Sequence, residues 1–209
     1  MNEISDGNII YWRGTSLYIN ITNRCTNDCI FCVKHFQNGV FGFNLSLTQD
    51  PSLDEILQEL FRHDISIYEE IVFTGFGEPL LRLDVVISIA KEIKRKSDIN
   101  LRIDTNGLVE LVYPHRDILL DLKNAGIDSL SISLNAESPE KYFEICKPKY
   151  GTDSYSAILS FAKKAKEYFQ VQFTVVDIPP INISSCKKIS EDIGIPLRIR
   201  HYSGPELTF

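Results

Sequence analysis

The feature that most constrains the fold is a regular alternation of strand-like and helix-like segments. Apolar, β-branched runs bounded by turn residues predict six strands, at 17–22, 70–74, 101–105, 129–134, 171–176 and 197–202. Helical patterns follow them, at 52–63, 84–96, 115–126, 139–146, 154–169 and 184–194. Gly126 and Gly194 are suited to helix C-caps, and Pro51 is suited to a first helical turn.

Strands that alternate with helices predict a parallel sheet with right-handed crossovers. Near-continuous apolar strands indicate that both faces of this sheet are buried. A complete barrel of eight such units takes about 250 residues, whereas six units fill the 209 residues of this chain. The expected fold class is therefore α/β, with a partial (βα)6 TIM-like barrel built on a parallel six-stranded sheet. A doubly wound open sheet is the alternative.

One domain is expected over 1–209, because no repeat, low-complexity tract or linker divides the chain. Within it we expect a lead-in at 1–16, the barrel at 17–202 and a C-terminal tail at 203–209. The last residues, GPELTF, are expected to cover the open side of the barrel.

The net charge and the distribution of apolar residues argue against nucleic-acid and membrane partners. The formal net charge of -6 and the sequence pI near 5.3 disfavour binding that works by neutralising phosphates, although a local basic groove would not show in this sum. Nucleic acid is therefore not an expected partner. The start of the chain, MNEISDGNIIYW, lacks a signal-peptide pattern, and no apolar run approaches the length of a membrane helix. We expect no membrane partner and a cytoplasmic location.

Small, polar or metal-competent residues follow all six predicted strands. In both candidate architectures functional residues collect at the C-terminal ends of the strands. The segments at these six ends are Thr22-Asn23-Arg24 with three cysteines, Gly75-Phe76-Gly77-Glu78-Pro79, Asp104-Thr105-Asn106-Gly107, Ser133-Leu134-Asn135, Asp177-Ile178-Pro179-Pro180 and His201-Tyr202-Ser203-Gly204.

Three cysteines, Cys25, Cys29 and Cys32, lie within eight residues after the first strand. An odd total of five cysteines, with three crowded together, fits reduced thiols better than a disulfide framework. A 4Fe-4S cluster usually takes four cysteines, so a cluster held by these three would leave one iron free for another ligand. A zinc site that adds His35 as its fourth ligand is an alternative. Buried thiols without a ligand and a redox pair are the others.

The combination of Cys25-x3-Cys29-x2-Cys32, an aromatic Phe31 before the last cysteine and Gly77-Glu78-Pro79 after the second strand resembles the radical S-adenosylmethionine (SAM) superfamily. The resemblance covers nearly the whole chain. It implies an enzyme in which the three cysteines hold a 4Fe-4S cluster. The open iron chelates SAM, and reductive cleavage of SAM gives a 5′-deoxyadenosyl radical that abstracts hydrogen from a substrate. The chain departs from many members at Phe76, where they have glycine.

The resemblance also implies which side chains meet SAM. The loop from Gly75 through Phe76 and Gly77 to Glu78 is expected to contact the methionine amino group through backbone oxygens, with glycine permitting a close approach. Phe31 is expected to lie at the adenine or over the cluster. The ribose and the methionine carboxylate are expected at Thr105, Asn106, Ser133 and Asn135. Each of these four residues, taken alone, is equally suited to a helix N-cap or a turn.

Other positions carry weaker expectations. Asp177 and His201 follow the last two predicted strands and lie at the same end of the barrel if these strands are neighbours in register. They are therefore candidates for the substrate pocket, with a capping or core role as the alternative. Cys146 and Cys186 are interpreted as small buried hydrophobes, with a redox or second-site role as the alternative. An electron donor such as flavodoxin or ferredoxin is an expected partner. The cation-rich stretches 91–96 and 163–167 are interpreted as solvated helix faces, and one of them is a candidate docking face for this donor.

Four longer segments together look like the radical SAM proteins associated with TatD-family nucleases, which predicts a functional link to such a nuclease. The segments are YINITNRCTNDCIFCVKH, VFTGFGEPLLRLD, RIDTNG and SISLNAES. A glycyl-radical-enzyme activase and a 7-carboxy-7-deazaguanine synthase-like enzyme are the alternatives within the superfamily. A non-catalytic binding module stapled by zinc is the alternative from another class.

Overall fold

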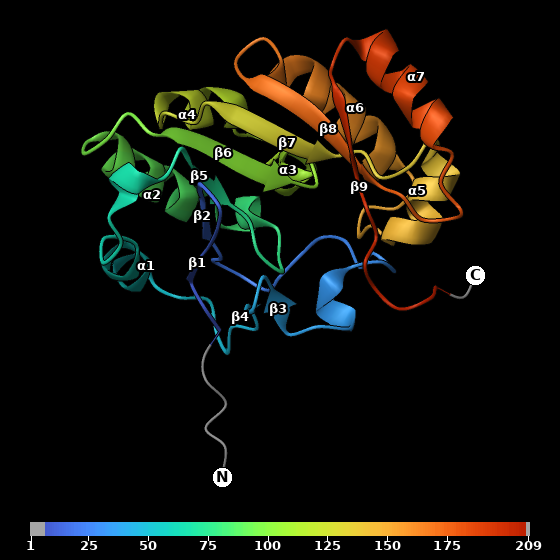
Figure 1. The fold of residues 1–209 in the computed structure, drawn as a ribbon. Coiled ribbons are helices and arrows are strands. Elements are labelled where there is room, and N and C mark those ends of the chain that lie inside the picture. Colours follow the sequence, from blue (N-terminus) through green and yellow to red (C-terminus); the bar gives the residue numbers. More distant parts are fainter. Residues whose placement is uncertain (1–6, 208–209) are drawn as a thin grey trace.

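A single seven-stranded sheet organises the chain in the computed structural model, which describes residues 7–207 (Figure 1). Its order is β1-β2-β5-β6-β7-β8-β9. The strands are β1 (Ile10–Arg13), β2 (Ser16–Ile19), β5 (Glu70–Phe73), β6 (Asn100–Thr105), β7 (Ser129–Ser133), β8 (Gln170–Val176) and β9 (Leu197–Arg200). Within residues 7–207 no helix has both the length and the apolar character needed to cross a membrane.

Six strands of this sheet, β2 and β5 to β9, are parallel, and each pairs with the one that follows it in this set. Right-handed crossovers are the rule between parallel neighbours and predict connecting helices on one face of the sheet; Figure 1 shows helices along the outer side of the curved sheet. This is the strand order of a barrel, and it differs from the doubly wound alternative, in which the order reverses. In the described part of the chain the two edge strands, β1 and β9, do not pair with each other, so the barrel is open.

The six predicted strands are the parallel ones of the main sheet, which has one strand more than predicted. β1 pairs antiparallel with β2, and Gly14, with φ +57°, lies in the turn between them. A short edge hairpin of this kind carries little apolar periodicity, so this strand falls within the lead-in expected at 1–16. A separate two-stranded hairpin, β3 (Gly39–Val40) and β4 (Phe43–Asn44), follows the cysteine segment.

Six of the helices occupy the six predicted segments with small shifts at their ends, whereas α3 and the short 3-10 helices were not predicted. The helices are α1 (Leu53–Leu60), α2 (Leu83–Lys94), α3 (Val109–Val112), α4 (Ile118–Asn124), α5 (Pro139–Cys146), α6 (Asp153–Ala165) and α7 (Ile183–Ile193), with short 3-10 helices η1 (Val33–His35), η2 (Ile65–Ile67) and η3 (Pro79–Arg82). α1 begins after a Ser52 capping box with Glu55, so Pro51 lies outside its first turn. Gly194, with φ +71°, caps α7, and Gly126, with φ +89°, follows α4.

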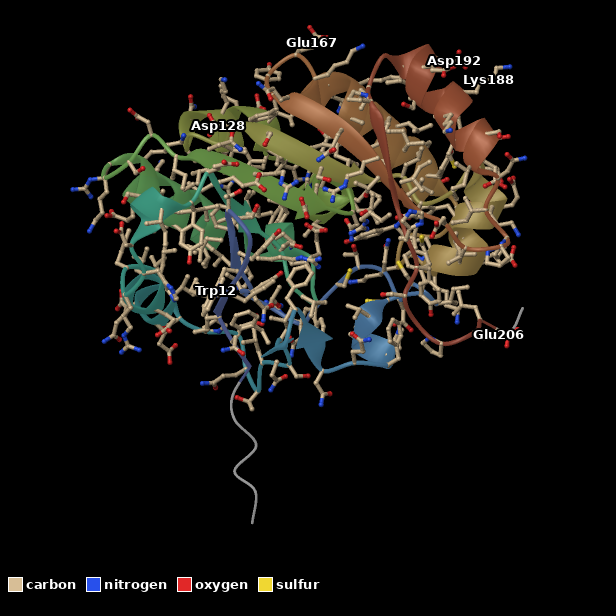
Figure 2. All side chains as sticks on the ribbon, in the orientation of Figure 1. Trp12, Asp128, Glu167, Lys188, Asp192 and Glu206 are labelled. Carbon is tan, nitrogen blue, oxygen red and sulfur yellow. The ribbon has the colours of Figure 1, made fainter. Side chains whose placement is uncertain are left out.

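The hydrophobic core lies between the sheet and the helices that cover one of its faces. Alternate strand residues such as Phe73, Ile103 and Phe173 are fully buried there against the helices. Figure 2 shows Lys188 and Asp192 on the outer side of α7, turned away from the sheet, so the helices separate the core from solvent.

The opposite face of the sheet, which we call the interior face, is mostly polar. Residues on it alternate with the buried apolar ones, and strand register aligns them across the sheet. They include Glu70, Arg102, Asp104, Ser129, Ser131, Gln172, Thr174, Arg198 and Arg200. The expectation that apolar residues bury both faces was therefore wrong for this face.

Candidate functional site

The cysteine loop, residues 20–32, runs from the end of β2 to η1, at the end of the sheet where the parallel strands finish (Figure 1). Cys25, Cys29 and Cys32 are half-buried free thiols. Phe31 packs against the main core, so its ring fixes the loop to the body of the protein. Contact of Phe31 with adenine stays a prediction.

The C-terminal end of α5 anchors one side of the cysteine loop. The last helical carbonyls accept hydrogen bonds from the loop, Ile145 O from Ile30 N at 2.9 Å and Cys146 O from Asp28 N at 3.0 Å. These carbonyls lack partners inside the helix, so the loop satisfies them. The Asn27 side-chain amide donates to the buried Tyr142 hydroxyl at 2.7 Å. Sequence reasoning missed this anchor, because the contacts join segments more than 110 residues apart.

The buried Glu78 carboxylate anchors the other side. Its Oε1 accepts hydrogen bonds from Thr105 Oγ1 at 2.8 Å and Leu80 N at 3.0 Å, and its Oε2 accepts one from Asn106 N at 2.6 Å. Its own backbone N–H donates to Arg24 O in the cysteine loop at 2.8 Å. Glu78 therefore joins the loop after β5, the end of β6 and the cysteine loop. Burial raises its pKa to about 7, against the opposing effect of these hydrogen bonds.

Two glycines before Glu78 permit close packing within the protein. A Cβ on Gly77 would lie 2.4 Å from Thr22 O and 2.5 Å from Arg24 O. A Cβ on Gly75 would lie 2.0 Å from Asn20 Oδ1. These contacts account for glycine at both positions without a ligand, and the expected approach of this loop to SAM stays a prediction. Phe76 is buried with Tyr11 and Leu45 in a second apolar cluster, so its ring points into packing.

Asn106 connects the end of β6 to the cysteines. Its side-chain Nδ2 lies 3.6 Å from Cys25 Sγ, as a donor, and donates to Thr26 Oγ1 at 2.8 Å. Its Oδ1 accepts from Leu108 N at 3.0 Å, which fixes the orientation of the amide. The structure therefore brings together Glu78, Thr105, Asn106 and Cys25, which the sequence places on three separate segments.

The protein surroundings favour the neutral form of all three thiols. Burial raises the pKa of Cys25 to about 12, and the nearby Glu78 adds to this effect. Contact with the Cys146 thiol, followed by burial, raises the pKa of Cys29, and burial raises that of Cys32. Three thiolates at this place therefore need a cation or a metal cluster to neutralise them. Cys146 and Cys186 are fully buried as predicted, but Cys146 also touches Cys29.

Three free thiols on one short loop make a donor set that fits a cluster held by three thiolates. Among residues 7–207 no three His, Cys, Asp or Glu side chains are grouped so that they could hold one metal ion. A zinc site needs each sulfur about 2.3 Å from the same ion, whereas an iron–sulfur cluster binds each thiolate on a different iron. His35, the expected fourth zinc ligand, is exposed, and its Nε2 lies 3.1 Å from Asp28 Oδ1.

Asn135 carries an unpaired acceptor at the end of β7. Its backbone is left-handed, with φ 55°, and its N–H is 3.3 Å from Thr174 O. Within the described part of the chain, its buried Oδ1 has no hydrogen-bond partner. An orphaned buried oxygen is costly and suits a ligand that supplies a donor. Ser133, two residues earlier, lies half-buried on the interior face.

Asp177 and His201 lie together at the ends of β8 and β9. His201 Nδ1 is in contact with Asp177 Oδ2, and Tyr202 N donates to Asp177 Oδ1 at 2.6 Å. This backbone donor, with His201 as the lesser cause, lowers the Asp177 pKa. The His201 side chain is 91% exposed. The pair therefore holds the start of the C-terminal tail in place, and a role in substrate binding stays a prediction.

Comparison with known proteins gives one family and several relatives. The Radical SAM superfamily matches residues 19–193. A GTP 3′,8-cyclase from Lactiplantibacillus plantarum is 36% identical over 132 residues, which cover 62% of this chain and 36% of that protein. An uncharacterized protein from Methanocaldococcus jannaschii is 27% identical over 181 residues, which cover 84% of this chain and 52% of that protein. This chain thus spans about half of one relative and about a third of the other.

Solved structures with the same fold include two that cover 93% of this chain. SuiB from Streptococcus suis, bound to S-adenosylmethionine, matches with a TM-score of 0.66 at 18% identity, over 41% of its own chain. TYW1 with a lysine–pyruvate adduct matches with a TM-score of 0.65 at 17% identity, over 67% of its own chain. At these identities the likeness concerns the fold.

Proposed function

We propose that the cysteine loop of this chain holds a 4Fe-4S cluster which binds SAM. The premise is that the chain belongs to the radical SAM superfamily and is therefore an enzyme. When bound, the two groups supply a one-electron cleavage of SAM that gives a 5′-deoxyadenosyl radical for hydrogen abstraction. Cys25, Cys29 and Cys32 are the proposed cluster ligands. The premise rests on the family match over residues 19–193.

The observation that carries the proposal is the contact between Asn106 Nδ2 and Cys25 Sγ. It places a fixed amide donor from the end of β6 beside the first thiol, and hydrogen bonds to sulfur stabilise the anionic form that a metal ligand requires. Glu78 holds this donor through the Asn106 backbone. The chain's own residues thus orient the cysteine loop from the β5 and β6 sides, while α5 fixes it from the other.

The proposed SAM contacts lie around this loop. Asn135 offers its unpaired Oδ1 as an acceptor, and Ser133 lies on the same strand end. We propose that these two residues, with Thr105 and Asn106, orient the ribose and methionine carboxylate. Because the Glu78 carboxylate already accepts three hydrogen bonds, we assign to Glu78 the task of positioning the loop, with backbone oxygens of 75–78 left for the methionine amino group.

The test is anaerobic reconstitution with iron and sulfide, followed by electron paramagnetic resonance of the reduced protein with and without SAM. The expected results are a 4Fe-4S signal that shifts when SAM is added and the formation of 5′-deoxyadenosine. Stoichiometric zinc with no cluster would instead support the zinc-stapled binding module.

Matched variants sharpen this test. Replacing Cys25, Cys29 or Cys32 by alanine should abolish cluster retention, because each thiolate binds a separate iron. Cys146→Ala and His35→Ala should retain the iron content of the parent. Loss of metal in His35→Ala but not in Cys146→Ala would contradict the three-thiolate assignment.

Within the superfamily we place the chain with the TatD-associated radical SAM proteins. Support comes from the combination of the cysteine segment, GFGEP, DTNG and SISLNAES. A functional link to a TatD-family nuclease, a reductant such as flavodoxin or ferredoxin and a cytoplasmic location form part of this proposal. A glycyl-radical-enzyme activase and a 7-carboxy-7-deazaguanine synthase-like enzyme remain the rivals. The activity named for the GTP 3′,8-cyclases belongs to proteins of which this chain spans about a third.

The C-terminal tail is proposed to shield the site. Tyr202 contacts Phe36 of the cysteine segment with ring centroids 6.0 Å apart, and Leu207 packs against the main core. Figure 2 shows Glu206 at the outer end of this segment. Truncation from Gly204 should speed the bleaching of the reconstituted protein in air, and an unchanged rate would remove this role. Residues 208–209 lie outside the described part of the chain.

A further inference from the structure

Two arginines of the edge strand β9, Arg198 and Arg200, face the interior of the sheet without a partner of their own. Leu197 and Ile199, which alternate with them, pack against the main core on the helix side. Because side chains alternate along a strand, the two guanidinium groups share the opposite face. Among the described residues neither side chain makes a hydrogen bond or an ion pair, and both are exposed to solvent.

Strand register places this arginine pair beside the site. Arg198 pairs with Thr174 and Arg200 with Val176 on β8, and Thr174 in turn pairs with Ser133 on β7. The Arg200 carbonyl accepts a hydrogen bond from Asp177 N at 3.0 Å, so Arg200 lies at the end of the sheet where the parallel strands finish. The pair is therefore separated from the proposed SAM contact Ser133 by β8 alone.

The carboxylates of the interior face are already engaged by a third arginine. Arg102 Nη2 donates to Glu70 Oε1 at 3.2 Å, and its Nε lies 3.5 Å from Asp104 Oδ1. Glu70 Oε1 also accepts from Ser16 Oγ at 2.7 Å. Three guanidinium groups thus face two carboxylates, and the face carries an excess of positive charge within a chain whose net charge is -6.

We infer that Arg198 and Arg200 bind an oxyanion group, phosphate or carboxylate, of a small-molecule substrate. The inference rests on the proposed function for the role of this ligand as substrate. Guanidinium groups bind such anions through paired, charge-assisted hydrogen bonds. Two of them on one strand face, two residues apart, would hold the anion at β9 and direct the rest of the substrate toward the cysteine loop.

The test measures binding of inorganic phosphate to the full chain, reconstituted anaerobically, by isothermal titration calorimetry. We expect the Arg198→Gln/Arg200→Gln double variant to bind phosphate at least about tenfold more weakly than the parent. Arg95→Gln is the matched control, because Arg95 is an exposed arginine of the α2 C-terminus paired with Glu92, and it should bind as the parent does. The Arg198→Lys/Arg200→Lys variant keeps the two charges but loses the paired N–H donors of the planar guanidinium groups. We expect its phosphate affinity to lie between those of the parent and the glutamine variant.

A second arm separates the two sources of the anion. Equilibrium dialysis with SAM should give the same affinity, within about twofold, for the double variant and the parent, because the arginines serve substrate. A parallel loss of SAM affinity would assign them to the SAM carboxylate and overturn the inference. So would a parent that binds no phosphate at millimolar concentration, or a double variant that binds it normally. Failure of the proposed function shows separately, as a parent without cluster or SAM binding.

Discussion

The carboxylate of Glu78 accepts a hydrogen bond from the backbone N–H of Asn106 at 2.6 Å, and it also accepts hydrogen bonds from the Thr105 hydroxyl and the Leu80 N–H. Glu78→Ala would leave these donors buried without an acceptor, so we expect the free energy of unfolding to fall by about 3 kcal/mol. Iron retention should fall as well. Urea denaturation and iron analysis measure both. Glu92→Ala, which removes an exposed carboxylate paired with Arg95, should change stability by less than about 0.5 kcal/mol.

The raised pKa of Glu78 predicts a specific pH dependence of stability. Its carboxyl titrates at about 7 in the folded protein, against 4.5 in the unfolded chain. Between these values the folded state holds a proton that the unfolded state has lost, so stability falls as pH rises and then stays constant above about 7. The full effect is about 3 kcal/mol. Unfolding curves across this range for the parent and Glu78→Gln should converge or cross as pH rises. A constant difference would mean that the three donors keep the carboxylate ionised throughout.

Gly77→Ala should displace the cysteine loop. The added Cβ meets two backbone oxygens of that loop, Thr22 O and Arg24 O, which cannot rotate away as a side chain would. We expect a loss of about 2–3 kcal/mol of stability together with poor cluster retention. Gly151→Ala is the control, because Gly151 has φ +68° and open space around it, so its variant reports backbone strain alone. Equal iron content in both variants would contradict the prediction.

Asn106→Leu should lower the reduction potential of the reconstituted cluster. The Asn106 amide donates toward Cys25 Sγ, and such donors favour the more negatively charged, reduced state. Its removal should shift the midpoint by on the order of tens of millivolts, as measured by redox titration. Thr26→Val is the control, because the Asn106 amide also donates to the Thr26 hydroxyl. This variant removes that hydrogen bond and keeps the contact between the amide and the sulfur. A shift of the same size in both variants would assign the effect to general loosening of the loop.

The strand and helix order was predictable because its signal is local. Each of the six predicted runs contains an observed strand to within a few residues at its ends, since β-branched runs and Gly caps act over a few positions. β1 was missed because an edge hairpin of four residues has too short a pattern to stand out. The polar interior face contradicts the expected burial of both faces. LRIDT and LRIR alternate polar with apolar residues, which is the pattern of strands with only one apolar face.

The site was predictable in its composition but only partly in its arrangement. The cysteine spacing, Glu78 and Asn106 all stand out in the sequence. The need for glycine at 75 and 77, in contrast, depends on the atoms that lie opposite them, the Asn20 side chain at Gly75 and backbone oxygens at Gly77. The anchor at Ile145 and Cys146 acts through main-chain carbonyls, which carry no side-chain signature. Arg198 and Arg200 are recognisable as a pair facing Asp104 only once the β8–β9 register is known.

The anchoring of the cysteine loop on α5 also sets an order of events during synthesis. The loop at residues 25–32 leaves the ribosome long before its supports at Tyr142, Ile145 and Cys146 have been made. Until these residues have emerged, the cysteine loop has its supports at Glu78 and Asn106 but lacks the support of α5 on its other side. On the proposed function, insertion of the cluster into a fully supported loop is therefore expected late in the maturation of this protein, after α5 has been made.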